Sequence, residues 1–320
     1  MTPYMTSLQN IKENVERVVV GKSQEIELSL TALLAGGHVL LEDVPGVGKT
    51  MMVRAIAQSV GADFKRIQFT PDLLPSDVTG VSVFNQQSLQ FEYRPGPVMS
   101  HVLLADEINR TSPKTQSALL EALEEGSVTV DGKTRDLKNP FFVMATQNPI
   151  EYGGTYPLPE AQLDRFLLKI DVGYPSHEEE FEMLSRLETG HPIDRLESVI
   201  SLEEIVAMKE EVARVYVDEA VKQYMIDLVQ STRNDSEIEL GASPRGTIAL
   251  MKVSQAYAFI QGRDYVLPDD VKQLAPYALG HRVILRSDLH MAERQGADVI
   301  RDVMGRIQVP ATRKEAKKWS

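Results

Sequence analysis

The stretch HVLLEDVPGVGKT, residues 38–50, constrains the fold of this chain more than any other part of the sequence. His38 to Leu41 is typical of a short buried strand, a glycine-containing turn follows, and residues 51–60 continue with helical spacing. In a strand–loop–helix unit, successive backbone N–H groups form a concave nest, and the helix directs its positive end toward the same point. The stretch therefore predicts a phosphate-binding loop; the alternative is a surface loop that contains Gly-Lys-Thr by chance.

The residues of this loop have distinct expected roles. Gly46 and Gly48 let the backbone approach phosphate oxygens without an intervening Cβ, and Lys49 is expected to reach the β- and γ-phosphates of ATP. The Thr50 hydroxyl is the expected Mg²⁺ ligand. Asp43 stands where the full pattern G-x-x-x-x-G-K-[ST] has glycine, and Asp tolerates the left-handed region better than most residues. The predicted nucleotide-binding set is Asp43, Pro45, Gly46, Val47, Gly48, Lys49, Thr50 and Met51.

Two helices are predicted before the loop, over residues 5–18 and 23–34, because apolar residues recur there at helical spacing. Val20 and Gly21 lie between these helices. Their backbone is a candidate contact for adenine, and a plain interhelical turn is the alternative.

Two further buried strands are predicted, each ending in polar residues. The apolar run from His101 to Ala105 leads into Asp106 and Glu107, and the run FFVMAT leads into Gln147 and Asn148. The carboxyl ends of parallel strands are where open α/β sheets place ligand chemistry. We expect Asp106 to be the second Mg²⁺ ligand, through water, and Glu107 to orient and deprotonate an attacking water. We expect Asn148 to hydrogen-bond the γ-phosphate and a water. The alternative for Asn148 is that it only initiates a turn, and the alternative for the two acids is that they form an exposed turn that caps the next helix.

Two arginines are candidate cations for the phosphates. Arg165 is the last residue of a short helix predicted over Glu160 to Arg165, and it either faces the phosphate of a neighbouring subunit or pairs locally with Asp164. Arg245 lies in the first turn of a helix that Ser243 and Pro244 are expected to begin, where a cation opposes the helix dipole. That unfavourable position suggests that an anion arrives there, although a solvated arginine remains the alternative.

The composition narrows the class of protein. Hydrophobic residues make up 42% of the 320 residues, and the net charge of −12 argues against a broadly basic nucleic-acid surface. Because cysteine is absent, disulfides and thiolate metal sites are excluded. The histidines show no metal-binding spacing; we interpret His38 and His101 as residues at strand ends and the others as surface residues. Without an apolar membrane segment or a signal-peptide pattern, we expect a cytoplasmic protein.

The pattern of strands and helices predicts two domains. Residues 1–175 have α/β character, with two hairpin insertions at about residues 81–94 and 127–137, and residues 176–320 are almost entirely helical and end in a basic tail. We place the boundary near residues 173–176, where Gly, Tyr, Pro and Ser follow one another.

Taken together, the motifs resemble the AAA+ ATPases and, within them, the MoxR family. The resemblance rests on LLEDVPGVGKT, RIQFTPDLLPSDVTG, LLADEINR, TSPKTQSALLEALEEG, ATQNPIEYGGTYPLPEAQLDRF and GASPRG, which occur in the order of the family. It implies an αβα core with a parallel sheet and a smaller, mostly helical lid. The resemblance also implies a role for each candidate residue. Lys49 and Thr50 resemble the Walker A pair, and Asp106 and Glu107 resemble Walker B. Asn148 resembles sensor 1, Arg245 resembles sensor 2, and Arg165 resembles the arginine finger, for which Arg110 is a competing candidate.

The resemblance also implies a function and partners. Such proteins hydrolyse ATP with Mg²⁺, assemble as rings that are usually hexameric, and remodel or mature protein clients. The clients of such proteins often carry a von Willebrand factor A domain, and the ATPase matures these clients or inserts a metal ion into them. The two hairpins would face a central pore.

Three other readings stay open on the residues alone. A small-molecule kinase would use the same loop, act as a monomer and need an acceptor other than water. A DNA-stimulated motor would be expected to present more basic surface, and an ATP-gated binding module would not need the pair Asp106 and Glu107.

Overall fold

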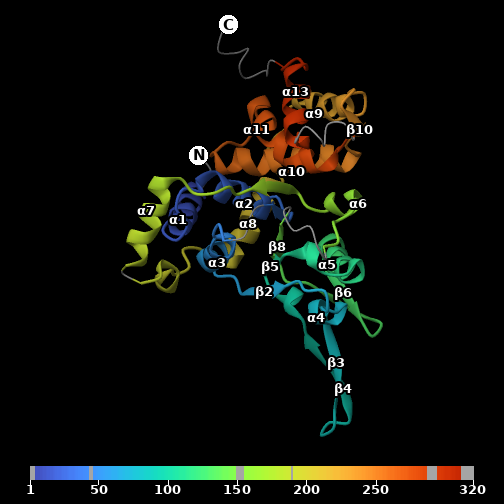
Figure 1. Ribbon diagram of the computed structural model, residues 1–320. Helices are drawn as coiled ribbons and strands as arrows, with labels where there is room; N and C mark the ends of the chain where they lie inside the picture. Colours follow the sequence, from blue (N-terminus) through green and yellow to red (C-terminus); the bar gives the residue numbers. More distant parts are fainter. Residues whose placement is uncertain (1–3, 43–45, 149–154, 189, 287–293, 311–320) are drawn as a thin grey trace.

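A five-stranded parallel sheet organises the N-terminal part of the chain. The computed structural model describes residues 4–42, 46–148, 155–188, 190–286 and 294–310 (Figure 1). The strand order is β2-β5-β8-β1-β9, and every adjacent pair is parallel. The strands are β1 (Val39–Glu42), β2 (Phe64–Gln68), β5 (Val102–Asp106), β8 (Phe142–Gln147) and β9 (Leu168–Asp171). The predicted parallel α/β core is therefore confirmed.

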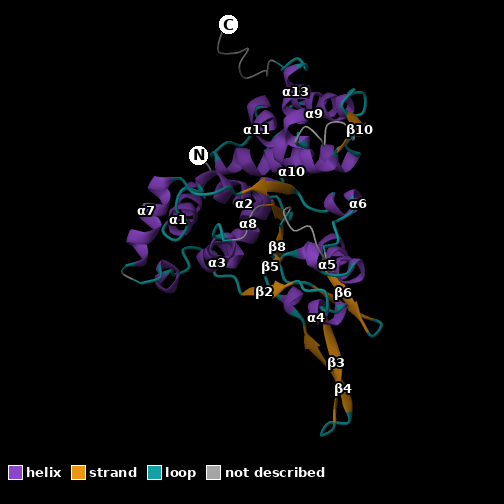
Figure 2. Ribbon diagram, in the orientation of Figure 1, coloured by secondary structure: helices purple, strands orange, loops and turns teal. Residues whose placement is uncertain are grey.

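The sheet is buried on both faces, as the continuous apolar runs indicated. On β1, Val39 and Leu41 belong to one hydrophobic cluster and Leu40 belongs to the other, because successive side chains of a strand point to opposite faces. Figure 2 shows helices on both sides of the sheet. One cluster includes residues of α1 (Met5–Glu16), α2 (Ser23–Leu34) and α3 (Lys49–Ser59); the other includes residues of α4 (Pro75–Thr79) and α5 (Pro113–Glu125).

Two antiparallel hairpins leave this core. The first pairs β3 (Gly80–Asn85) with β4 (Gln90–Pro95) and projects from the body of the molecule (Figure 1). The second pairs β6 (Ser127–Val130) with β7 (Lys133–Asp136). Its turn residues Asp131 and Gly132 both have positive φ, which matches the twist of a two-residue hairpin turn.

Helices dominate the rest of the chain. Four of them begin at capping side chains: Ser176, Ser201, Asp218 and Ser243 each accept a hydrogen bond from a backbone N–H of the first turn. The elements are α6 (Glu160–Leu163), α7 (His177–Leu187), α8 (Leu202–Val212), α9 (Glu219–Thr232), α10 (Pro244–Ile260), α11 (Pro268–Leu279), α13 (Gly296–Gly305), the short strands β10 (Ile238–Leu240) and β11 (Ile284–Leu285), and the 3₁₀ turns η1 (Pro97–Met99), η2 (Ile108–Arg110), η3 (Pro192–Arg195) and η4 (Gly280–Arg282).

One predicted helix has different bounds. The helix α6 ends at Leu163, two residues before the predicted end, so Arg165 lies in an irregular segment.

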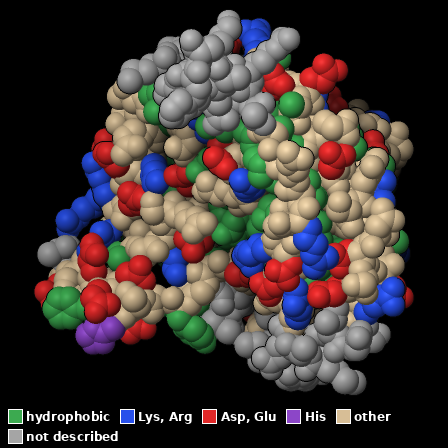
Figure 3. Space-filling view, turned by 90° about the horizontal axis from the view of Figure 1, so that it is seen from above, with side chains coloured by type: hydrophobic (Ala, Val, Ile, Leu, Met, Phe, Trp, Pro, Cys, Tyr) green, Lys and Arg blue, Asp and Glu red, His purple; other side chains and the backbone are tan. Residues whose placement is uncertain are grey.

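The lid helices α9, α10, α11 and α13 stack on one end of the core (Figure 1). Here α10 contacts α2, and α11 contacts β9, so the lid rests against an edge of the sheet. Seen from above, acidic and basic side chains intermingle over the coloured part of this face (Figure 3). Among the described residues, no helix combines the length and the apolarity that crossing a membrane requires.

Candidate active site at the carboxyl edge of the sheet

The loop between β1 and α3 brings the positive end of a helix to the edge of the sheet. Gly48 is the N-cap of α3 and has φ +87°, and Gly46 has φ +92°. Both values lie in the left-handed region that glycine adopts most easily, and a Cβ at either position would meet no atom of the described residues within 4 Å. The described part of the chain therefore leaves this space open to a ligand. The predicted contacts Asp43 and Pro45 lie outside the described residues.

One cavity of about 240 Å³ brings most of the predicted site together. It lies where β1, β5 and β8 end, because parallel strands present their carboxyl ends on the same edge. Its lining residues are Gly46, Gly48, Lys49, Thr50, Met51, Arg66, Gln68, Asp106, Glu107, Thr146 and Asn148.

Asp106, at the end of β5, is held by both neighbouring strands. The Thr146 hydroxyl of β8 donates to Asp106 Oδ1 over 2.6 Å. From β2, Arg66 donates to Asp106 Oδ2 through Nη2 at 2.7 Å and Nε at 3.1 Å. The carboxylate therefore has one oxygen fixed by a hydroxyl and the other paired with a half-exposed guanidinium, which a bound cation would have to replace.

Glu107 occupies a left-handed backbone conformation, with φ +56° and ψ +50°. A non-glycine residue in this region is uncommon and is worth relating to function. Its backbone N–H donates to the Thr146 hydroxyl at 2.8 Å, which holds the turn. Its Oε2 accepts hydrogen bonds from Gln68 Nε2 at 2.6 Å and Arg110 Nη1 at 3.0 Å.

Asn148 follows β8 on the same edge and is buried, with 7% of its surface exposed. Its carbonyl oxygen accepts a hydrogen bond from Asn109 Nδ2 at 3.1 Å, which ties the turn after β5 to the turn after β8. The acids and the carboxamide are thus held on one framework, as their positions at strand ends predicted.

A second cavity, of about 120 Å³, adjoins the glycine loop and is largely apolar. Val20 lines it, whereas Gly21 does not; a Cβ at Gly21 would collide with the Glu179 carboxylate of α7. The remaining lining residues are Val18, Val19, Lys22, Gly46, Val47, Gly48, Met51, Pro175, Met183, Arg186, Leu187, His191 and Pro192.

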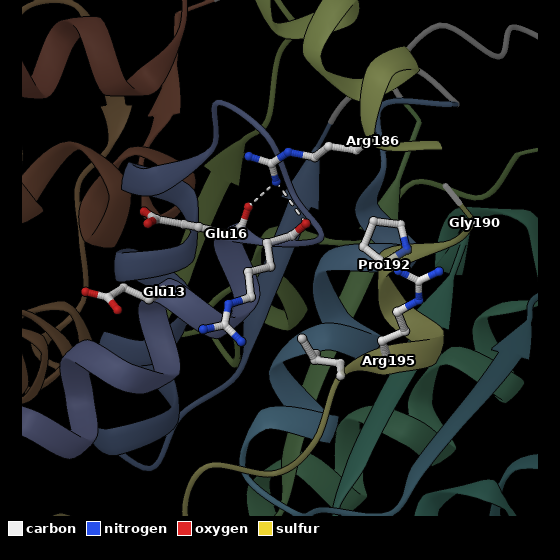
Figure 4. Close-up of a pocket in the computed structure, with 8 residues that line it drawn as sticks. Glu13, Glu16, Arg186, Gly190, Pro192 and Arg195 are labelled. Atoms are coloured by element: carbon white, nitrogen blue, oxygen red, sulfur yellow. Dashed lines mark hydrogen bonds between the residues drawn. The ribbon is translucent and has the colours of Figure 1, made fainter. Parts of the chain in front are cut away.

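Arg186 of α7 fixes one wall of this second cavity. Its Nη1 donates to the carbonyl oxygens of Glu16 at 2.6 Å and Arg17 at 2.8 Å, at the end of α1 (Figure 4). Because the last carbonyls of a helix have no partners within the helix, this contact caps α1 and holds the start of the segment 17–20. The same side chain also lines a more open cavity of about 530 Å³ (Figure 4).

Arg165 and Arg245 lie elsewhere. Arg165 Nε is 2.9 Å from Glu124 Oε2, and Arg245 contacts the other oxygen of the same carboxylate. Both arginines line a third cavity, of about 220 Å³, and none of its described lining residues also lines the cavity of Asp106. Arg165 therefore pairs with Glu124 and not with Asp164, and the anions at Arg245 are Glu124 and, at 4.0 Å, Asp164 of the same chain.

Three residues of the site were not singled out from the sequence. Arg66, Gln68 and Thr146 hold the two acids, although RIQF and FFVMAT carry no mark of this role. Arg66 and Gln68 alternate on one strand, so their side chains share a face. That signal becomes informative only once β2 is known to lie beside β5.

The cavity fits a nucleoside triphosphate with a divalent cation. Open space borders two left-handed glycines at a helix N-terminus. Thr50 and Asp106 line the same cavity, and their hydroxyl and carboxylate are oxygen ligands of the kind that Mg²⁺ prefers. Among the described residues, no group of three or more His, Asp or Glu forms a separate metal site. Such a cation would thus share its ligands with phosphate and water.

Comparison with known proteins agrees with this geometry. Residues 38–168 match the ATPase family associated with various cellular activities (AAA), and residues 230–303 match the AAA lid domain. The chain is 61% identical to YeaC of Bacillus subtilis over 94% of both chains. It is 44% identical to chaperone MoxR1 of Mycobacterium tuberculosis, covering 92% of this chain and 80% of that protein.

The fold has a close counterpart among solved structures. A crystal structure from Cytophaga hutchinsonii, of a protein described as a proposed ATPase, superposes with a TM-score of 0.90 at 40% identity and covers 96% of each chain. A glycine-containing loop, two acids and a carboxamide around one cavity, followed by a helical lid, agree with these matches. With the sequence identity to MoxR1, they establish that this chain belongs to the MoxR family of AAA+ ATPases.

Proposed function

We propose that this ATPase acts as a ring, in which each phosphate cavity is completed by arginines of the neighbouring subunit, to remodel or mature a protein client. The observation that carries the proposal is the separation within one chain. Lys49, Asp106 and Glu107 line one cavity, whereas Arg165 and Arg245 line another.

In the proposed nucleotide complex, the phosphates lie against residues 46–50 and the base enters the apolar cavity beside them. Val20, Val47 and Met51 would contact the base, with Leu187 of α7 as a further wall. Apolar walls beside a polar phosphate nest suit a flat heterocycle joined to a charged chain. Asp43, Pro45 and Gly21 stay predicted contacts of this nucleotide.

Mg²⁺ would be held by Thr50 and, through water, by Asp106. When bound, it would neutralise charge on the β- and γ-phosphate oxygens. For Asp106 to serve, Arg66 has to release Oδ2, while the Thr146 hydroxyl keeps Oδ1 in place.

Glu107 is the proposed general base. It would accept a proton from the attacking water, which Asn148 would help to orient together with the γ-phosphate. Gln68 and Arg110 both donate to Glu107 Oε2 and would have to give way to that water.

Arg165 is the better candidate than Arg110 for the residue supplied to the neighbour. Arg110 contacts Glu107 of its own chain, which supports a role at the cavity of its own subunit. Arg165 and Arg245 are held together by Glu124 and line another cavity. A cation that stabilises charge developing on a transferred phosphoryl group can come from a neighbouring subunit.

We propose that the projecting hairpin of β3 and β4 binds the client. Leu89 and Phe91 are each 73% exposed, and Phe91 packs edge-to-face on Phe84, with ring centroids 5.4 Å apart. Exposed apolar side chains on a protruding hairpin favour contact with another protein. We propose a chaperone-like role in the cytoplasm, with a hexameric ring as the assembly. We further propose that the client carries a von Willebrand factor A domain and that remodelling inserts a metal ion into this client.

A domain boundary near residues 173–176 is proposed to separate the core from the lid and tail. Pro175 lines the base cavity, and α7 begins two residues later. Movement of the chain at this boundary would therefore change the wall of the cavity proposed for the adenine base.

The proposal is tested by ATP hydrolysis measured per subunit over a range of protein concentrations, without acceptor or DNA. The rate should rise with concentration and then saturate, and Arg165→Ala should abolish turnover while nucleotide binding survives. A rate independent of concentration, or a need for a small-molecule acceptor, would reject the ring and favour a kinase; a rate that requires DNA would favour a motor.

A further inference from the structure

A buried arginine of the lid, Arg282, binds the segment that carries Arg165. Arg282 lies at the end of η4, and its side chain is only 3% exposed. Its Nε donates to Asp164 Oδ1 at 2.6 Å, and its Nη2 donates to the carbonyl oxygens of Phe166 at 2.8 Å and Asp164 at 3.1 Å. Nη1 donates to Leu167 at 3.3 Å and also contacts the carbonyl oxygen of Ala278. One guanidinium therefore fixes residues 164–167.

The neighbouring residue strengthens this grip. His281 is buried, contrary to its interpretation as a surface residue, and its Nε2 lies 3.0 Å from the carbonyl oxygen of Phe166. A carbonyl only accepts, so Nε2 carries the proton. Burial lowers the pKa of His281 well below its usual value, which keeps the ring neutral.

Asp164 also connects this segment to a second lid element. Its Oδ2 accepts a hydrogen bond from the Ser243 hydroxyl, 3.3 Å away, at the start of α10. Arg245, two residues farther along, lies 4.0 Å from the same oxygen. The Asp164 carboxylate thus joins η4 and α10 to the core.

The chemistry of a buried arginine explains why this contact is specific. Its planar fork satisfies several acceptors at once, and burial without such partners would be strongly unfavourable. Lysine keeps the charge but lacks the fork, so it cannot hold Asp164, Phe166 and Leu167 together. The backbone on either side of Arg165 then loses its fixed position.

We propose that Arg282 is a positioning residue that fixes residues 164–167 against the lid, so that Arg165 is presented to the phosphate cavity of the neighbouring subunit. The inference rests on the ring arrangement proposed above. Movement of the lid in one subunit would then move the arginine offered to the next.

The test uses Arg282→Lys in the full chain. We expect turnover to fall about 10- to 100-fold, as for a misplaced catalytic group. The dissociation constant for a fluorescent ATP analogue should change less than about two-fold, because the binding cavity of the same subunit is untouched. Arg301→Lys, which removes the fork from an exposed lid pair with Asp298, is the matched control and should leave both values unchanged.

Mixing subunits separates positioning from a general structural defect. Arg282→Lys keeps an intact phosphate cavity, and Glu107→Gln keeps an intact Arg165. In an equal mixture, about a quarter of the interfaces join a competent cavity to a competent arginine, so about a quarter of the wild-type rate should return. Arg165→Ala mixed with Glu107→Gln is the positive control, and Lys49→Ala mixed with Glu107→Gln should stay inactive.

Each outcome is decisive. If Arg165→Ala recovers in the mixture and Arg282→Lys does not, Arg282 acts within its own subunit and the inference is wrong. If Arg165→Ala itself does not recover, the ring arrangement fails, and this inference with it. Should Arg282→Lys not fold, Asp164→Asn replaces it, because asparagine keeps the shape and one acceptor; the same mixing result is expected.

Discussion

Gln68 Nε2 donates a hydrogen bond to Oε2 of Glu107 over 2.6 Å, and Arg66 in turn donates to Gln68 Oε1 at 2.7 Å. The proposed general base is therefore held by the neighbouring strand rather than directed at a water. Before Glu107 Oε2 can accept a proton from a water, as proposed, Gln68 and Arg110 have to release it.

Removing this contact should raise basal hydrolysis. For Gln68→Ala we expect turnover without client to rise roughly three- to ten-fold, since about 1 kcal/mol of ground-state stabilisation is lost. Nucleotide affinity should not change. Steady-state ATPase assays check this, with Gln86→Ala in the exposed β3–β4 turn as the control. A drop in turnover would show instead that Gln68 directs Glu107 toward water.

Replacing Glu107 itself should separate binding from chemistry. Glu107→Gln keeps the shape of the side chain but removes the proton acceptor, so we expect turnover to fall about 10²- to 10⁴-fold while ATP stays bound. Glu121→Gln makes the same change on the exposed surface of α5 and should be neutral. Hydrolysis at the wild-type rate by Glu107→Gln would disprove the assignment of the base. The variant also traps clients for pull-down experiments.

The glycine loop predicts a contrast between two alanine variants. Gly48 and Gly126 have φ of +87° and +62°, and among the residues that the structure describes a Cβ at either would meet no atom within 4 Å. Alanine in the left-handed region costs about 1–2 kcal/mol, so both variants should lose similar stability. Only Gly48→Ala should weaken nucleotide binding, because its Cβ enters the phosphate space. Denaturant unfolding and nucleotide titration measure the two effects, and equal affinities for the two variants would argue against the phosphate nest.

The buried imidazole of His38 predicts a loss of stability in acid. Burial is the main cause that lowers the pKa of His38 from 6.5 to about 4, and its Nδ1 accepts a hydrogen bond from the Val143 N–H at 3.1 Å. Since the unfolded chain takes up this proton first, the contribution is complete above pH 6.5 and is lost as the pH falls toward 4, by about 3 kcal/mol.

His38→Asn keeps an acceptor for Val143 but does not titrate in this range. The difference in unfolding free energy between pH 7 and pH 4 should therefore be about 3 kcal/mol smaller for His38→Asn than for the wild type. His177→Asn, on the exposed surface of α7, should retain the pH dependence of the wild type. Parallel curves for all three proteins would mean that the pKa of His38 is the same in the folded and the unfolded chain.

The sequence by itself determined the local units. The run from Val39 to Glu42, the two loop glycines and the helix from Lys49 follow from hydrophobic periodicity and turn chemistry. The same logic placed Asp106 and Asn148 at strand ends, and parallel strands that end on one edge brought them into one cavity.

Only the tertiary structure decided how distant residues meet. Arg66 and Asp106 are 40 residues apart and meet because β2 pairs with β5, and strand order leaves no local mark in the sequence. Arg282 and Asp164, 118 residues apart, meet because the lid packs against the edge strand. Periodicity reports which face of an element is apolar, but it carries no information about which element covers that face. Packing and the need to pair buried charges choose the partners, and both emerge only when the whole chain has folded.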